Sequence, residues 1–305
     1  MDALDSATAG SKTGLAYWAD HVRGLERVEP TALAHMTGHP RFPDACRVVM
    51  RETIDVQRHD PRLMRVLADT RRTVMAFFVM YLDVRGGITL TAIRELCTEL
   101  GLASPGRATG LLISLRMLGY IVPDPAPSDR RSRRYVPSQK TLEAMARNLR
   151  IWGLAFSEIE PEALRIANRF DDRRVSDAYI LQLAKGLITL IKRRDTSAVT
   201  LFAERNAGME ILYTLATAGQ PDDAFPPREP VEVASGALAG RFKVSRSHVV
   251  RLLRDAEKLG YVTRHGTTVT MNEPLRAGLV EYMAAYFFGF ASCACAALEA
   301  IGETP

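Results

Sequence analysis

The sequence predicts a mainly α protein with small β-hairpins, in which one unit occurs twice on a helical scaffold with pseudo-two-fold symmetry. Two segments share Leu-Gly-Tyr followed by a β-branched residue, LRMLGYIV at 115–122 and AEKLGYVT at 256–263. Apolar residues recur at helical spacing before and after each copy. A short segment with strand-like residues and a turn follows each Leu-Gly-Tyr string. The chain therefore repeats one arrangement of helices and a hairpin.

Taken in order, the chain divides into four expected regions. They are an N-terminal helical segment at 1–70, a first unit with its tail helix at 71–157, a connecting helical region at 158–204, and a second unit with its tail helix at 205–305. A chain of 305 residues, of which 47% are hydrophobic, can bury a sizeable core, and its length suggests about two domains.

Each unit has the pattern of a helix-turn-helix followed by a wing. In the first unit a helix at 93–100 precedes a turn and a second helix that begins near Ser104; in the second unit these helices are at 234–242 and from Ser245 onward. Hairpin segments follow at 120–138 and 261–272. In a helix-turn-helix the second helix is placed to enter the major groove of DNA.

Further helices surround the two units. We expect helices before them at 72–82 and 209–216, and tail helices after them at 141–157 and 275–292. The connecting helix is expected to begin at an N-cap, Ser176, and to end in basic residues at 192–194. The proline-rich segment 219–230 is expected to be a loop within the second unit.

The second helix of the second unit carries polar residues opposite its apolar stripe. Its expected DNA-contacting residues, with one arginine of the following hairpin, are Ser245, Arg246, Ser247, His248, Arg251, Arg254 and Arg264. Arginine and other polar side chains on such a helix can bind base edges and phosphates.

The first unit offers fewer such residues on its second helix and more on its wing. The expected DNA contacts are Ser104, Arg107 and Thr109 on the helix, and Arg130, Arg131, Arg133 and Arg134 on the hairpin. A run of guanidinium groups at a hairpin tip suits phosphates or a narrow minor groove. Our hypothesis is that the second unit reads the sequence while the first unit anchors the protein through its wing.

The first wing contains Asp129-Arg130-Arg131, followed by Val136-Pro137-Ser138. In these residues the segment 88–142 resembles the MarR family of winged-helix regulators. The resemblance implies that Asp129 braces the wing, that Arg131 reaches into the minor groove, and that helices between the units enclose a small-molecule effector.

A row of small residues in the last helix allows two interpretations. Ala285, Gly289, Cys293 and Ala297 recur at a spacing of four, which permits close approach of another helix. That helix is either the connecting helix of the same chain or the same helix of a second copy, which would make a homodimer.

Several other kinds of site are not expected. His35 and His39 have metal-ligand spacing, but Gly38 and Pro40 oppose a single helix there, and Cys293 and Cys295 point to opposite sides of a helix rather than forming a redox pair. No nucleophile elbow, phosphate loop or zinc-peptidase motif is present, so we expect neither an enzyme nor a cofactor.

The sequence also predicts a location. The amino terminus lacks the basic and apolar regions of a signal peptide, and the four cysteines form no disulfide pattern, which favours the cytoplasm, at the nucleoid. Residues 282–298 form 17 uncharged positions, slightly fewer than the roughly 20 that span a bilayer, and have acidic flanks; no membrane span is expected.

We therefore expect a transcription regulator that binds double-stranded DNA through two unlike readers. A formal charge of +5 and an isoelectric point near 9.1 favour an anionic partner. Two alternatives remain open at this stage. A plasmid-type replication initiator also joins two winged helices in one chain, and a winged-helix assembly module would use the fold to bind protein.

Overall fold

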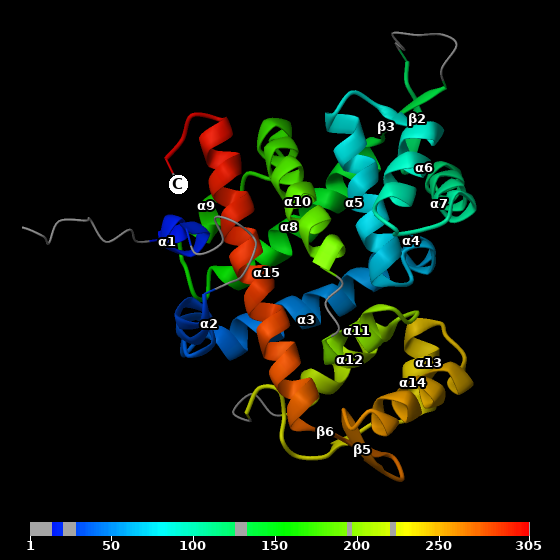
Figure 1. Cartoon of the computed structure of the whole chain (residues 1–305), viewed down its shortest axis with the longest axis vertical. Coiled ribbons are helices and arrows are strands. Elements are labelled where there is room, and N and C mark those ends of the chain that lie inside the picture. The colour runs from blue at the N-terminus through cyan, green and yellow to red at the C-terminus, as the bar shows by residue number, and fades with distance from the viewer. Residues whose placement is uncertain (1–13, 21–28, 126–132, 194–196, 220–223, 305) are drawn as a thin grey trace, which may run out of the picture.

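A computed structural model describes residues 14–20, 29–125, 133–193, 197–219 and 224–304. Within them the protein is mainly helical and has two small antiparallel sheets, which confirms the mainly α prediction. Figure 1 shows the two sheets towards opposite ends of the long axis of the molecule.

The first unit is a run of six elements between residues 70 and 137. They are α5 (Thr70–Val84), β1 (Ile88–Thr89), α6 (Leu90–Glu99), α7 (Pro105–Met117), β2 (Ile121–Pro123) and β3 (Arg134–Pro137). The strands form an antiparallel sheet in the order β1-β3-β2, in which Ile88 pairs with Tyr135 and Val122 with Val136.

The second unit repeats this element order between residues 208 and 271. Its elements are α12 (Gly208–Ala216), β4 (Val231–Glu232), α13 (Ser235–Phe242), α14 (Arg246–Lys258), β5 (Val262–His265) and β6 (Thr268–Met271). The sheet order β4-β6-β5 corresponds to that of the first unit. Sequence analysis found the hairpins but missed β1 and β4, because two residues are too few to show an alternating pattern.

The remaining helices form the body that carries both units. They are α1 (Gly14–Asp20), α2 (Pro30–Thr37), α3 (Phe42–His59), α4 (Pro61–Val66), α8 (Gln139–Phe156), α9 (Ala163–Ala167), α10 (Arg173–Arg193), α11 (Ala198–Ala203) and α15 (Glu273–Ala300). In Figure 1, α15 runs along the long axis of the molecule and α3 crosses its middle. α15 packs against α10 and α1, and α3 packs against α8 and α12.

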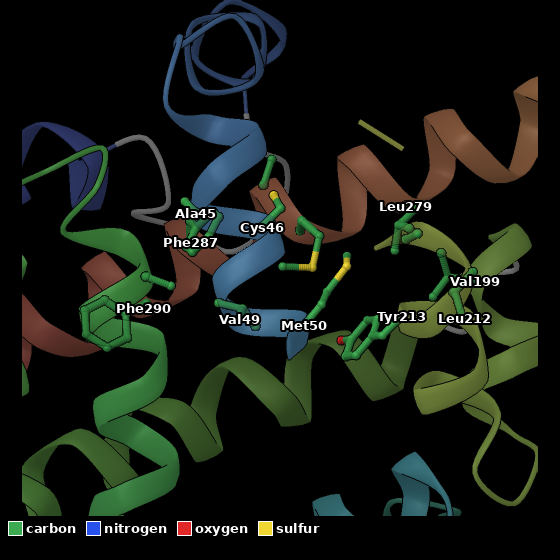
Figure 2. Packing of buried hydrophobic residues seen from close by; sticks show 14 of the residues in the cluster. Ala45, Cys46, Val49, Met50, Val199, Leu212, Tyr213, Leu279, Phe287 and Phe290 are labelled. Atoms are coloured by element: carbon green, nitrogen blue, oxygen red, sulfur yellow. The ribbon is translucent and has the colours of Figure 1, made fainter. Parts of the chain in front are cut away.

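Two clusters of buried residues stabilise this arrangement. The smaller cluster lies in the first unit and includes Phe78, Ile93 and Leu112. The larger one joins the second unit to the N-terminal helices and to α8, the tail helix of the first unit. Figure 2 shows its centre, where Val49 and Met50 of α3 lie between Phe287 of α15 and Tyr213 of α12. The tail helices therefore join the two units through one shared core.

The helix α15 is mostly a core helix. It is long and apolar enough to cross a membrane, but 61% of its most apolar 18-residue window is buried inside the protein, and core helices of soluble proteins meet the same criterion. Within the small-residue row, Cys293 and Ala297 are buried and Ala285 is exposed. The place that a Cβ on Gly289 would take has no atom of another described segment within 4 Å. The chain itself covers the C-terminal half of the row, and a homodimer through the other half stays a prediction.

Two expectations about the helix boundaries have different outcomes. Ser176 is not an N-cap: α10 begins three residues earlier, at Arg173, and the Ser176 hydroxyl donates to the Arg173 carbonyl inside the first turn. A serine can satisfy its hydroxyl in this way within a helix, so its presence alone does not mark a helix start. Within the segment 219–230, residue 219 and residues 224–230 form neither helix nor strand, as expected of a loop, and residues 220–223 lie outside the described residues.

Asp60 joins three parts of the first half of the chain. One carboxylate oxygen accepts the backbone N–H groups of Arg62 and Leu63 at the start of α4. The other accepts the Tyr120 hydroxyl at 2.8 Å and forms an ion pair with Lys140 of α8 at 2.8 Å. Burial raises the pKa of Asp60, but these hydrogen bonds and the Lys140 charge outweigh it and lower the pKa from 3.8 to about 2.

We expect Asp60→Asn to remove a pH-dependent part of the stability. Asparagine still caps α4 and still accepts a hydrogen bond, so the change isolates the charge. Because the folded pKa is lowered, the carboxylate stabilises the fold above about pH 4 and loses that effect as the pH falls towards 2. Urea unfolding should show the variant about 1 kcal/mol less stable at pH 7 and the difference vanishing near pH 2. A difference independent of pH would contradict this role.

Candidate nucleic-acid interface

The helix pair α13 and α14 is the best-formed candidate interface. Val249, Leu252, Leu253 and Ala256 of α14 are at most 1% exposed, so one side of the helix is fixed in the core. Ser245 caps the helix by accepting the backbone N–H of His248 at 3.1 Å. The residues on the opposite side of the helix must therefore face outward.

The outward side of α14 is rich in arginine. Arg246, Ser247, Arg251 and Arg254 are all exposed, as the sequence predicts. Among the described residues, none of these three arginines forms an ion pair, whereas the nearby carboxylates of Asp255 and Glu257 pair with Arg205 and Arg264. The helix thus presents positive charge that the protein does not neutralise, in a form that suits an anionic partner.

Two other predicted residues of α14 have partners inside the protein. The His248 ring nitrogen Nε2 donates to the backbone carbonyl of Asn206, at 2.9 Å, just before α12. Ser245 caps the helix, and its hydroxyl lies 3.0 Å from that of Ser247. The His248 bond holds α14 to the segment before α12, and Arg246, Arg251 and Arg254 are the predicted arginines that this helix exposes.

A cleft lies between α14, the start of α13 and the hairpin of β5 and β6. Its volume is about 390 Å³. The lining residues are Val233, Ala234, Ser235, Gly236, Arg246, Val250, Arg264, Gly266 and Thr267. The start of α13 lines the cleft, and among the described residues no side chain caps it, so its first N–H groups lack a side-chain acceptor.

The chemistry of this cleft suits a phosphate group. A helix N-terminus carries partial positive charge, and two arginines, Arg246 and Arg264, add full charges. Arg264 is also 3.6 Å from Glu257, which holds the guanidinium beside the cleft. Sequence analysis named both arginines but missed the uncapped helix start; the signal was Ala234, a poor capping residue, directly before the helix.

The corresponding helix of the first unit has a different surface. Ser104 and Arg107 are exposed at its start, but the Thr109 hydroxyl accepts from Arg94 at 2.9 Å and donates to the Pro105 carbonyl at 2.7 Å. Farther along, Ile113 and Met117 are 52% and 81% exposed. The start of α6 is capped by Thr89, unlike the start of α13. The first unit therefore offers fewer polar groups to a groove.

The arginine-rich wing of the first unit is only partly described. Arg130 and Arg131, with Asp129, lie outside the described residues. Arg133 is exposed. Arg134 is half-buried in β3. Its side-chain Cδ lies 3.4 Å from the place that a Cβ would take if Gly87 had a side chain. Of the two described arginines, Arg133 is the one free to reach an anion.

Other candidate sites receive no support from the described part of the chain. It contains no group of three or more His, Cys, Asp or Glu residues placed to bind a metal, and His35 instead bonds to the Tyr17 hydroxyl at 2.8 Å. Cys293 and Cys295 are buried free thiols, and burial raises the pKa of Cys293, which disfavours the reactive thiolate.

Comparisons of the chain with protein-family models, with curated proteins and with solved structures found no match. Any function must therefore be argued from the residues of this chain.

Proposed function

We propose that the protein is a sequence-specific transcription regulator that binds double-stranded DNA, and that each unit is a winged helix-turn-helix. The element order of helix, strand, two helices and a hairpin, present twice with the same sheet order, supports this proposal. Such a unit places its second helix in a major groove and its wing beside the neighbouring backbone.

One observation carries the proposal. Three exposed arginines follow the outward side of α14, and the first of them, Arg246, also lines a cleft together with Arg264 and the uncapped start of α13. A helix of 13 residues fits a major groove about 12 Å wide, where arginine binds the O6 and N7 acceptors of guanine. A backbone phosphate in the cleft would fix the depth and register of α14.

The two units would contribute differently to DNA binding. α14 offers arginines along its length, whereas α7 offers Arg107 in its first turn, the apolar Ile113 and Met117 farther along, and one further arginine in its last turn. That arginine, Arg116, lies over the Tyr135 ring of the wing. The second unit would choose the sequence, and the first would add affinity through Arg107 and Arg133. A protein with two unlike readers suits an asymmetric DNA site, and its work would be done at the nucleoid in the cytoplasm.

The first test is the salt dependence of duplex binding. We expect the logarithm of the affinity for a random-sequence duplex to fall linearly with the logarithm of the salt concentration, with a slope of about −3 or steeper. Fluorescence anisotropy at several salt concentrations measures it. Arg165→Ala, on α9 at the far side of the body, is the control and should leave the slope unchanged. A nearly flat dependence would contradict DNA binding.

A further inference from the structure

The outward side of α7 differs from that of α14 at the positions that would meet a DNA groove. The repeat aligns Leu111 of α7 with Leu252 of α14, an offset of 141 positions. At that offset, the exposed residues Ser247, Arg251, Arg254 and Lys258 of α14 correspond to Gly106, Gly110, Ile113 and Met117 of α7. The first unit therefore has glycine and apolar residues where the second unit has a serine and three cations.

These four positions of α7, Gly106, Gly110, Ile113 and Met117, form an exposed row that we call the α7 seam. They recur at intervals of four, three and four residues, the heptad spacing at which one helix packs against another. Ile113 and Met117 are the two large apolar residues that α7 exposes. The places that a Cβ would take on Gly106 and Gly110 have no atom of another described segment within 4 Å. The α7 seam thus offers two apolar side chains to bury and two open positions where a partner helix can approach closely.

The charges beside the α7 seam are positive. Arg107 follows Gly106 and Arg116 precedes Met117, which places them at the two flanking heptad positions, one on each side of the seam. α7 contains no aspartate or glutamate. Among the described residues neither arginine forms an ion pair, and Arg116 lies over the Tyr135 ring at 5.9 Å from its centre. Flanking positions of this kind determine which partner helix is accepted, through salt bridges across the interface.

The same charges decide between two possible occupants. Two copies of α7 would bring arginine to both sides of their interface, with no acidic residue of either helix to pair it, and like charges across an interface oppose binding. A helix with an apolar stripe and carboxylates beside it would pair with both Arg107 and Arg116 and would bury Ile113 and Met117. Charge complementarity therefore favours an acidic amphipathic helix over a second copy. Figure 1 shows α7 at the outer edge of the first unit, where such a helix can reach it.

We propose that the α7 seam is the docking site for an acidic amphipathic helix of another protein, and that the docked helix competes with DNA for the first unit. The competition rests on the proposed function, because Arg107 is the residue that both partners would contact; the docking does not. While the helix is docked, α14 stays free, so the protein keeps its choice of DNA sequence but binds DNA with lower affinity.

The docking is tested with a displayed library of peptides, each about three heptads long, and the purified full-length protein. Leucine occupies the two seam positions of every heptad, and the other positions vary among glutamate, lysine, glutamine and alanine. We expect the selected peptides to carry glutamate beside the leucines and to bind Met117→Ser about tenfold more weakly than the wild type. Leu259→Ser, which changes an exposed leucine of the second unit, is the control and should bind the peptides as the wild type does.

Three results of the selection would overturn the site: lysine beside the leucines, equal binding of the peptides to Met117→Ser and the wild type, or no selected peptide. Sedimentation of the protein alone tests the other occupant. We expect the wild type and Met117→Ser to sediment alike. A dimer that Met117→Ser dissociates would overturn the acidic helix in favour of a second copy.

The competition is tested by titrating a random-sequence duplex with and without a selected peptide, at a concentration that saturates the wild type but not Met117→Ser. We expect the peptide to lower the wild-type affinity for the duplex about tenfold and to have little effect on Met117→Ser. An unchanged wild-type affinity would overturn the competition. If no duplex is bound at all, the proposed function fails, while the peptide selection still tests the docking.

Discussion

Arg251→Ala is expected to lower the affinity for the DNA site selected by the wild type about 10- to 100-fold. Arg251 is exposed in the middle of α14 and, among the described residues, has no ion pair, so its guanidinium is free to bind a base edge. The affinity for a random-sequence duplex should fall much less, because the variant loses at most one phosphate contact there. Anisotropy titrations with both duplexes measure the two effects.

Arg133→Ala is the matched comparison for that result. Arg133 is exposed at the base of the first wing, where contact with the backbone would carry no sequence information. We expect it to weaken binding to selected and random duplexes by similar factors. If Arg251→Ala and Arg133→Ala changed the sequence preference equally, the division of work between the units would be wrong.

Phe287→Ala is expected to cost about 3–5 kcal/mol of the free energy of unfolding. Phe287 is fully buried on α15, and its ring lies 5.4 Å from that of Phe156, 6.0 Å from that of Phe42 and 6.2 Å from that of Trp152. These contacts join α15 to α3 and to α8, the tail helix of the first unit. Removing the ring therefore leaves a cavity where the two halves meet.

Leu154→Ala provides the control for that loss. Leu154 lies on α8, near Phe156, but is 42% exposed, so its truncation leaves no enclosed cavity. Urea unfolding monitored by circular dichroism should show a change below about 1 kcal/mol for Leu154→Ala. Similar losses for the two variants would contradict a shared core centred on Phe287.

The fold was largely predictable where local patterns determine it. The stripe of Val249, Leu252 and Leu253 determines α14, and the Leu-Gly-Tyr strings mark where α7 and α14 end in both units. The strands β1 and β4 were not predictable, because each pairs only two residues with a distant hairpin. The N-cap prediction for Ser176 was wrong because serine is common at N-caps but also fits within the first turn of a helix, where its hydroxyl can bond to a backbone carbonyl.

The candidate site was predictable in part. The exposed positions of Arg246, Arg251 and Arg254 follow from helical periodicity alone. The bond from His248 to Asn206 depends on a contact between segments far apart in the chain. No local pattern encodes such contacts, so tertiary structure was needed to find them.

We propose that α14 reads the base sequence of duplex DNA. Genome-wide enrichment of DNA fragments by the purified protein, run in parallel for the wild type and Arg251→Ala, is the decisive measurement. We expect a compact, asymmetric motif upstream of genes with the wild type, and its loss with the variant. Scattered enrichment, none at all, or the same motif with both proteins would contradict it.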